Sequence, residues 1–277
     1  MVSLIPSMNI AFSLTAGIPI YTFPLLLGLG ATLGIAWVAS QAPLNQTRLR
    51  VDAALWAILG GTLGSRIAFV LVNWAYFRDH IWESLAIYQG GMSWPGALIG
   101  GALALLLAAR LLDIPVGKLA DAMLPLAASL AVSAWLGCWL TGCAYGPPAN
   151  NIWGIPAIDE WGELASRWPT QLIGALLALV LFWLLDRSRA WSITPAWVKH
   201  PGSAAGLGLL GLSLEMLALS FLRADPSPGW QGLRLDAWAS LALAILAALP
   251  VLITYLRWRQ SSKEDQQELE ASHKPTH

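Results

Sequence analysis

The chain has 277 residues, of which 56% are apolar and only 12% are charged, about half the usual charged share of a soluble domain. Its sixteen basic and sixteen acidic residues cancel, and its mean hydropathy is +0.59. This composition excludes a nucleic-acid binder that works through bulk positive charge, a disordered chain and a disulfide-rich secreted module. Sixteen tryptophans, a residue type that favours membrane–water interfaces, indicate instead a polytopic membrane protein.

Seven apolar stretches approach or reach the ~20 helical residues that cross a bilayer core of ~30 Å. Because backbone groups that face lipid find no water, we expect these stretches to be helical. In chain order the predicted spans are Ile18–Ser40, Val51–Asn73, Pro95–Leu112, Leu119–Leu140, Gln171–Asp186, Ser203–Leu222 and Asp236–Leu256. The sequence therefore predicts an all-α polytopic membrane protein with seven transmembrane helices and a small external head, formed by the loops 74–94 and 141–170.

The distribution of Lys and Arg predicts how the spans are oriented. Loops after the first, third, fifth and seventh spans carry eleven of these residues, the loops on the other side carry four, and Arg66 lies inside the second span. By the positive-inside rule the N-terminus is outside and the C-terminus is cytoplasmic. We thus expect an external N-terminal segment at 1–17, without the charged region of a cleavable signal peptide, a transmembrane domain at 18–256 and a polar cytoplasmic tail at 257–277.

Two charged residues lie inside the predicted spans, Arg66 in the second and Glu215 in the sixth. An arginine at the centre of a helix costs ~2.5–3.5 kcal/mol on the insertion scale, so its side chain should face the bundle interior or a wet cavity. One interpretation is a structural ion pair between the two residues. The favoured one is a contact with a head group or substrate, because intramembrane charges often mark functional paths.

Arg167 and Arg223 lie at the outer ends of predicted helices. The planar fork of a guanidinium suits phosphate oxygens, and lipid phosphates lie at this depth. These residues are therefore candidate phosphate contacts, although interfacial arginines also snorkel without any specific ligand.

The two cysteines, Cys138 and Cys143, lie at the end of the fourth predicted span. In a continuous helix their Cα atoms are about 7.5 Å apart, beyond the ~7 Å limit for a disulfide. They can form a disulfide only if the helix breaks near Gly142. No histidine is near them in the sequence, so we expect no metal site and two small buried residues.

Five segments carry a resemblance to a known family. The segment Gly90–Gly100, with the sequence GGMSWPGALIG, closely resembles a motif of the phosphatidylglycerol–prolipoprotein diacylglyceryl transferases. The other segments resemble further elements of that family in the same order, and they are Leu63–Phe69, Leu136–Gly146, Arg167–Leu172 and Phe221–Pro226. The resemblance covers residues 17–256, nearly the whole predicted membrane part.

This resemblance implies a reaction and its partners. The family transfers a diacylglyceryl group from phosphatidylglycerol to a cysteine thiol of a lipoprotein precursor, and glycerol phosphate leaves. The expected setting is the bacterial inner membrane. The expected partners are phosphatidylglycerol or another anionic phospholipid and the signal peptide of the precursor, with no cofactor and no nucleic acid. Such chemistry requires an environment that favours the thiolate form of the cysteine. It also requires cationic hydrogen-bond donors that stabilise the leaving phosphate.

The resemblance also assigns candidate roles to residues. Arg66, Arg167 and Arg223 are expected to contact the lipid phosphate or head group, and Ser93, Tyr145 and Gln171 to orient the substrate. Glu215, a charge inside a predicted span and outside the matched segments, is also expected to orient the substrate. The family's histidine and the arginine that opens its signature are Pro95 and Trp135 here, so the catalytic residues are not assigned. This difference leaves open a non-catalytic or re-purposed relative that binds lipid or lipoprotein.

Overall fold

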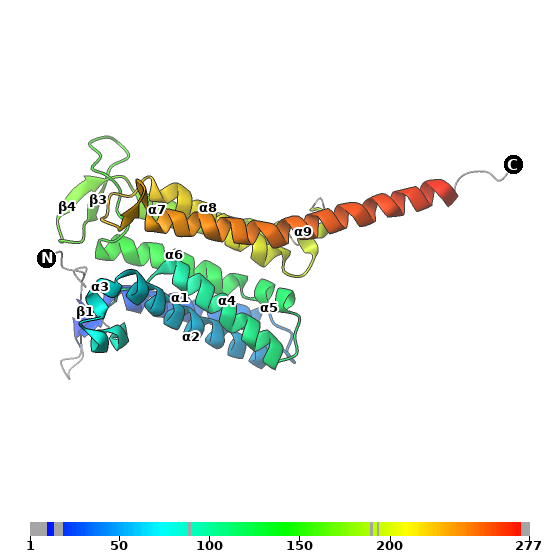
Figure 1. The fold of residues 1–277 in the computed structure, drawn as a ribbon, viewed down its shortest axis with the longest axis horizontal. Coiled ribbons are helices and arrows are strands. Elements are labelled where there is room, and N and C mark those ends of the chain that lie inside the picture. Colours follow the sequence, from blue (N-terminus) through cyan, green and yellow to red (C-terminus); the bar gives the residue numbers. More distant parts are fainter. Residues whose placement is uncertain (1–9, 14–18, 88–89, 189–190, 193, 273–277) are drawn as a thin grey trace.

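The computed structural model describes residues 10–13, 19–87, 90–188, 191–192 and 194–272 (Figure 1). Within this part of the chain, seven helices are long and apolar enough to cross a membrane. They are α1 (Thr22–Ser40), α2 (Thr47–Val72), α4 (Trp94–Leu111), α6 (Leu124–Thr141), α7 (Thr170–Ser188), α8 (Ser203–Ser220) and α9 (Leu235–Ser272). The predicted helical fold class and the number of spans are confirmed. Of the predicted external segment 1–17, only residues 10–13 are described.

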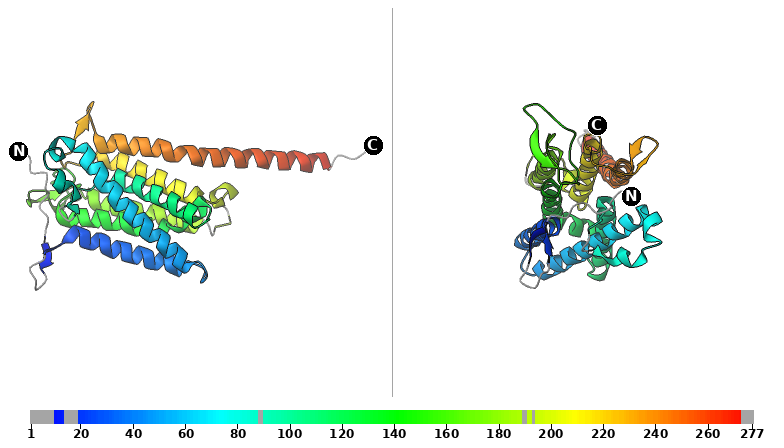
Figure 2. Two further views of the ribbon diagram at one scale, coloured as in Figure 1. Left: turned by 60° about the horizontal axis from the view of Figure 1, so that its bottom comes forward. Right: turned by 90° about the vertical axis from the view of Figure 1, so that its left-hand side faces the viewer.

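The long helices run side by side, with α6 between a group formed by α1, α2 and α4 and a group formed by α7, α8 and α9 (Figures 1 and 2). Many of their large apolar side chains face outward; Leu33, Leu71 and Leu246, for example, are 62–67% exposed. An apolar surface of this extent has a lipid bilayer as its natural solvent. The helices therefore keep their small and polar side chains inside and present leucine to the surroundings.

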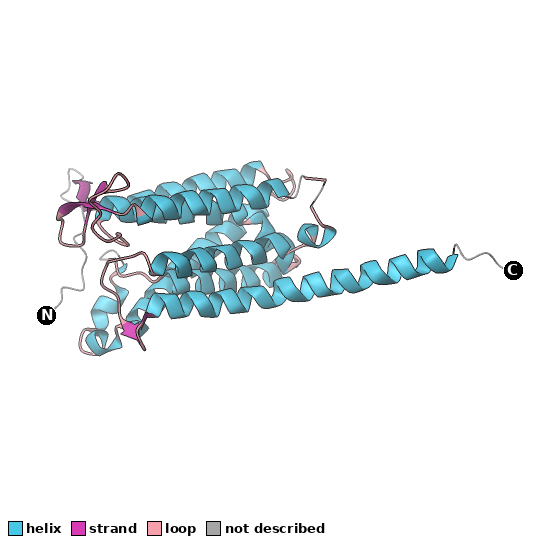
Figure 3. Cartoon of the chain, turned by 90° about the horizontal axis from the view of Figure 1, so that it is seen from above, coloured by secondary structure: helices cyan, strands magenta, loops and turns pink. Residues whose placement is uncertain are grey.

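Short elements occupy both ends of the bundle. One end, called here the head end, carries three antiparallel hairpins, together with the short helices α3 (Trp74–Phe77) and η1 (Ile81–Leu85) (Figures 1 and 3). The hairpins are β1 (Ile10–Ser13) with β2 (Pro19–Tyr21), β3 (Ile155–Ile158) with β4 (Leu164–Arg167), and β5 (Gly229–Trp230) with β6 (Leu233–Arg234). The opposite end carries α5 (Val116–Ala122) and η3 (Ala196–Lys199).

The largest differences at the start of a helix are in the first, second and fourth predicted spans; the second was expected from Val51, but α2 begins at Thr47. The first span was expected from Ile18, but α1 begins at Thr22 because residues 19–21 pair with β1 as a strand. The fourth span was expected as one helix from Leu119, and this is wrong: α5 ends at Ala122 and α6 begins at Leu124. Pro125 lies in the first turn of α6, where its missing N–H and fixed φ favour a helix start.

The seventh span is longer than predicted. It was expected to end at Leu256 and to give way to a polar tail, but α9 continues to Ser272 and extends well beyond the rest of the bundle (Figure 1). Residues 257–272 are rich in Arg, Lys, Gln and Glu, which are good helix formers, so the helix continues after its apolar part ends. The boundary at 257 is thus a change in composition within one helix.

Helices α2 and α4 pack backbone against backbone. A Cβ atom built on Gly64 would lie 2.5 Å from the carbonyl oxygen of Gly96, and one built on Gly100 would lie 2.2 Å from that of Gly60. Only glycine permits so close an approach, which brings the polar backbone of both helices into van der Waals contact. This contact fixes the position of α2, which carries Arg66, relative to the loop that precedes α4.

Candidate functional site

Arg66 lies in α2 near the head end and is only 6% exposed. Its guanidinium donates hydrogen bonds to backbone carbonyls of η1 and of the segment just before α4. Nε donates to Ser84 at 2.8 Å and Nη2 to Glu83, both in η1, while Nη1 donates to Gly90 at 2.6 Å and to Gly91 at 3.2 Å. The rings of Phe69 and Phe77 lie 5.8 and 5.4 Å from its Cζ. Arg66 therefore holds the head-end segment against α2.

Ser93 lies beside this arginine. It is half-buried, it precedes α4 as the N-cap residue, and its N–H donates to the carbonyl of Ser65, the neighbour of Arg66. A Cβ built on Gly91 would lie 2.9 Å from Nη1 of Arg66, and Gly91 has a positive φ of 71°. Glycine is thus required at this position, both for its backbone conformation and for the closeness of the arginine.

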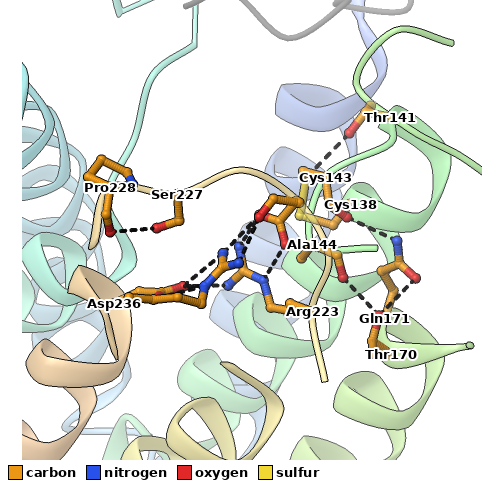
Figure 4. A network of polar contacts seen from close by, with 12 residues as sticks. Cys138, Thr141, Cys143, Ala144, Thr170, Gln171, Arg223, Ser227, Pro228 and Asp236 are labelled. Carbon is orange, nitrogen blue, oxygen red and sulfur yellow. Dashed lines mark hydrogen bonds and ion pairs between the residues drawn. A yellow bond between two sulfur atoms is a disulfide. The ribbon is translucent and has the colours of Figure 1, made fainter. Parts of the chain in front are cut away.

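The chain leaves α6 at Gly142, which has a φ of 76° in the left-handed region. This break brings the Cα atoms of Cys138 and Cys143 to 4.5 Å, and the two residues form a disulfide (Figure 4). The expectation of two unlinked, buried cysteines is therefore wrong, and the condition set for a disulfide, a break near Gly142, is met. The N–H of Cys143 also donates to the carbonyl of Cys138 at 3.1 Å.

The loop after the disulfide, residues 143–146, offers its carbonyl groups to neighbouring segments. Nε2 of Gln171 donates to the carbonyl of Cys143 at 3.0 Å, and Oγ1 of Thr170 donates to that of Ala144 at 2.8 Å (Figure 4). Gln171 and Thr170 are fully buried at the start of α7. Gln171 therefore binds the chain itself, and it fixes the loop to α7.

Tyr145 and Arg167 form the centre of a second buried cluster. The Cζ atom of Arg167 lies 4.5 Å from the centroid of the Tyr145 ring, and its Nη2 donates to Oδ2 of Asp159 at 3.0 Å. All three side chains are at least nine-tenths buried. Burial, together with the neighbouring Glu160 carboxylate, raises the pKa of Tyr145 above its usual value of 10.0, so its phenol stays protonated.

Arg223 belongs to a closed cluster of two arginines and two aspartates. Its Nε donates to Asp225 at 2.8 Å and its Nη1 to Asp236 at 3.0 Å, while Arg234 binds the same two carboxylates from the other side. Burial alone would lower the pKa of Arg223, but the hydrogen bond to Asp225 and the charges of both aspartates raise it. The cluster is electrically neutral, and Figure 4 shows it beside the disulfide loop.

Glu215 lies in α8 and is 8% exposed. Its Oε1 accepts a hydrogen bond of 2.9 Å from Nε1 of Trp135 in α6, and its Oε2 is buried and has no hydrogen-bond partner among the described residues. The alternative of an ion pair with Arg66 is wrong, because that arginine bonds to backbone carbonyls near the other helix group. The partner of Glu215 is therefore Trp135.

The predicted site residues thus form two groups. Arg66 and Ser93 lie together on α2 and the start of α4. The others lie around the head ends of α6, α7 and α8, and the N–H of Ala224 donates to the carbonyl of Tyr145 at 2.8 Å, which links the Arg223 cluster to the loop. Sequence reasoning missed the acidic partners Asp159 and Asp236. The repeated pattern Arg-x-Asp at 223–225 and 234–236 was a usable signal for the second.

Comparison with known proteins places this geometry in a family context. A family model described as prolipoprotein diacylglyceryl transferase matches residues 9–254. A phosphatidylglycerol–prolipoprotein diacylglyceryl transferase of Trichormus variabilis is 33% identical over 177 residues, which are 61% of this chain and 62% of the relative, so that alignment spans less than two thirds of either protein. Proteins of the same name from Streptomyces griseus subsp. griseus and Brucella ovis are 28% and 29% identical over 84% and 80% of this chain, and over 72% and 77% of their own.

Proposed function

Because the chain belongs to the prolipoprotein diacylglyceryl transferase family, we propose that it transfers a diacylglyceryl group from phosphatidylglycerol to a cysteine thiol of a lipoprotein precursor. It is a multi-pass protein of the bacterial inner membrane. In this reaction the thiol loses its proton, and the sulfur attacks the carbon of the diacylglyceryl unit that is bonded to the phosphate oxygen. The carbon–oxygen bond breaks, a thioether forms, and glycerol phosphate leaves with the electron pair. The developing negative charge is therefore on the phosphate.

The buried charge of Arg66 is the observation that carries the proposal. Among the described residues, no carboxylate lies within 4.0 Å of this guanidinium, whereas Arg167 and Arg223 are paired with aspartates. Four backbone carbonyls accept from Arg66, and a guanidinium has five N–H donors, so one donor on Nη2 is left for a ligand. A buried cation that only dipoles compensate attracts an anion, and a lipid phosphate is the anion available at this depth.

The remaining site residues take supporting roles in this proposal. Arg167 and Arg223 contact the head group through donors that their aspartates leave free, and the aspartates fix their orientation. Ser93, Tyr145, Gln171 and Glu215 orient the substrate or the loops around it. The buried phenol of Tyr145, which stays protonated, is a hydrogen-bond donor suited to a phosphate or glycerol oxygen.

We infer that the head end faces away from the cytoplasm. In the sequence, eleven Lys and Arg follow the first, third, fifth and seventh predicted spans and only four follow the others, and the positive-inside rule assigns the richer side to the cytoplasm. The disulfide lies at the head end, and disulfides persist in oxidising compartments such as the periplasm. These two arguments are independent of each other, and both support a site on the outer side, where lipoprotein precursors emerge from the membrane.

The test uses the purified full chain in vesicles that contain phosphatidylglycerol, with a synthetic precursor peptide whose cysteine is the acceptor. We expect a thioether product and rescue of a transferase-depleted bacterium by the wild-type chain. The variant Arg66→Gln should raise the KM for phosphatidylglycerol about tenfold or more, because a charge-assisted contact to phosphate is lost.

Arg78→Gln is the matched control, since this head-end arginine is exposed and should leave the KM unchanged. An unchanged KM in a folded Arg66→Gln protein contradicts the assigned phosphate contact. Binding of phosphatidylglycerol without any thioether product or rescue contradicts the transferase activity, and it favours a re-purposed relative in which Pro95 and Trp135 replace the family's catalytic groups.

A further inference from the structure

The disulfide Cys138–Cys143 lies at a point where the backbone conformation is unfavourable. Gly142 and Ala144, on either side of Cys143, both have positive φ values, 76° and 53°. A Cβ on Gly142 would lie 2.2 Å from the carbonyl oxygen of Asp159. Alanine rarely adopts the left-handed conformation, so the surroundings must hold Ala144 in place. The disulfide is the covalent part of those surroundings.

The loop that the disulfide holds connects three segments of the head end. The carbonyls of residues 143 and 144 accept hydrogen bonds from Gln171 and Thr170 (Figure 4). The carbonyl of residue 145 accepts one from the N–H of Ala224. Through these bonds the end of α6 is joined to the start of α7 and to the segment after α8. The same loop carries Tyr145, whose ring lies against the guanidinium of Arg167. A shift of this loop would therefore displace Tyr145 and disturb its contact with Arg167 of β4 and the hydrogen bond from Gln171 of α7.

We propose that the disulfide Cys138–Cys143 is a redox-sensitive positioning clamp, which holds the loop 143–146 so that Tyr145, Arg167 and Gln171 keep the arrangement required for substrate; its effect on activity rests on the proposed function. A dithiol reductant converts the disulfide into two thiols and is itself oxidised to a disulfide, a balanced exchange of two electrons and two protons. Both cysteines are half-buried, and the chain has no other cysteine. Reduction therefore changes this bond alone.

The first experiment measures the clamp without activity. The oxidised full chain in detergent or nanodiscs is compared with the same protein reduced by a dithiol and with the variant Cys138→Ala/Cys143→Ala, and alkylation followed by intact mass reports the redox state. We expect amide hydrogen exchange at Ala224 and in the segment 143–146 to become about tenfold faster or more on reduction. Exchange within the α2–α4 contact should not change, and reoxidation should restore the slow exchange. Exchange that is equal in the oxidised and reduced forms overturns the proposal.

The second experiment asks whether the clamp positions the site. Reduction should lower kcat/KM for thioether formation about 10- to 100-fold, because small displacements of positioned groups cost this much. Reoxidation should restore the value, and the double alanine variant should be slow and insensitive to the reductant. Equal kcat/KM before and after reduction, with altered exchange, overturns the positioning role. If the oxidised wild type forms no thioether at all, the proposed function fails, and hydrogen exchange still decides whether the clamp exists.

Discussion

The indole N–H of Trp135 donates a hydrogen bond of 2.9 Å to the carboxylate of Glu215, and the two buried side chains join α6 to α8 inside the bundle. A Cβ built on Gly174 of α7 would lie 2.3 Å from the indole ring, so α7 also packs closely against Trp135. The pair therefore connects three helices directly below the disulfide loop. The hydrogen bond of a neutral donor thus satisfies one oxygen of the buried carboxyl.

The variant Trp135→Phe should destabilise the protein by ~1–3 kcal/mol, because the buried Glu215 carboxyl then loses its hydrogen-bond partner. Thermal or denaturant unfolding in detergent measures the change. Trp82→Phe is the matched control, since Trp82 is 82% exposed, and a surface substitution usually changes stability by less than ~0.5 kcal/mol. In a double-mutant cycle with Glu215→Leu, the two losses should be less than additive; full additivity would contradict the coupling.

The variant Arg223→Ala should destabilise the folded state by ~1–3 kcal/mol, because it leaves two half-buried carboxylates with a single arginine. Arg78→Ala serves as the control, because its pair with Asp79 is exposed and is expected to contribute at most ~1 kcal/mol. Equal unfolding midpoints for the two variants would show that the neutral cluster of two arginines and two aspartates has no structural role.

The variant Gly100→Ala should separate α2 from α4, since the added methyl group would lie 2.2 Å from the carbonyl oxygen of Gly60. We expect a loss of ~1–3 kcal/mol, typical of overpacking in a close contact. Gly28→Ala in α1 is the matched control, because a Cβ there meets no atom within 4 Å. Alanine also stabilises a helix by about 0.5–1 kcal/mol relative to glycine. The first variant should therefore unfold more easily and the second should not; a Gly100→Ala protein as stable as the wild type would refute the close contact.

The raised pKa of Tyr145 predicts a specific loss of stability in alkali. In the unfolded chain the phenol ionises near its usual pKa of 10.0, whereas the folded state holds the proton to higher pH because of burial and the nearby Glu160. The contribution is fully present below pH 10.0 and is lost as the pH rises above it. Tyr145→Phe should therefore lose less stability than the wild type between about pH 8 and about pH 11. Unfolding midpoints at the two pH values measure this, and equal losses would contradict it.

The number of spans could be predicted from the sequence, because an apolar stretch in lipid must satisfy its own backbone hydrogen bonds. A stretch of about 20 apolar residues in a membrane has no structure open to it other than a helix, so hydropathy alone located all seven. The ends were harder to place. Pairing of residues 19–21 with β1 shortens the first helix, and a proline turn divides α5 from α6, and both depend on local backbone contacts. The continuation of α9 to Ser272 depends on helix propensity, which hydropathy does not measure.

The candidate site divides in the same way. Sequence alone identified the arginines at positions 66, 167 and 223, because a cation in or near a membrane is costly and conspicuous. Only the tertiary structure decided what each one contacts: aspartates for Arg167 and Arg223, and backbone carbonyls for Arg66. Which group an arginine contacts depends on which distant segments meet in the fold, and the residue types and their spacing do not reveal this. For the same reason the cysteines formed a disulfide, since a single left-handed glycine shortened a distance that a continuous helix would have kept.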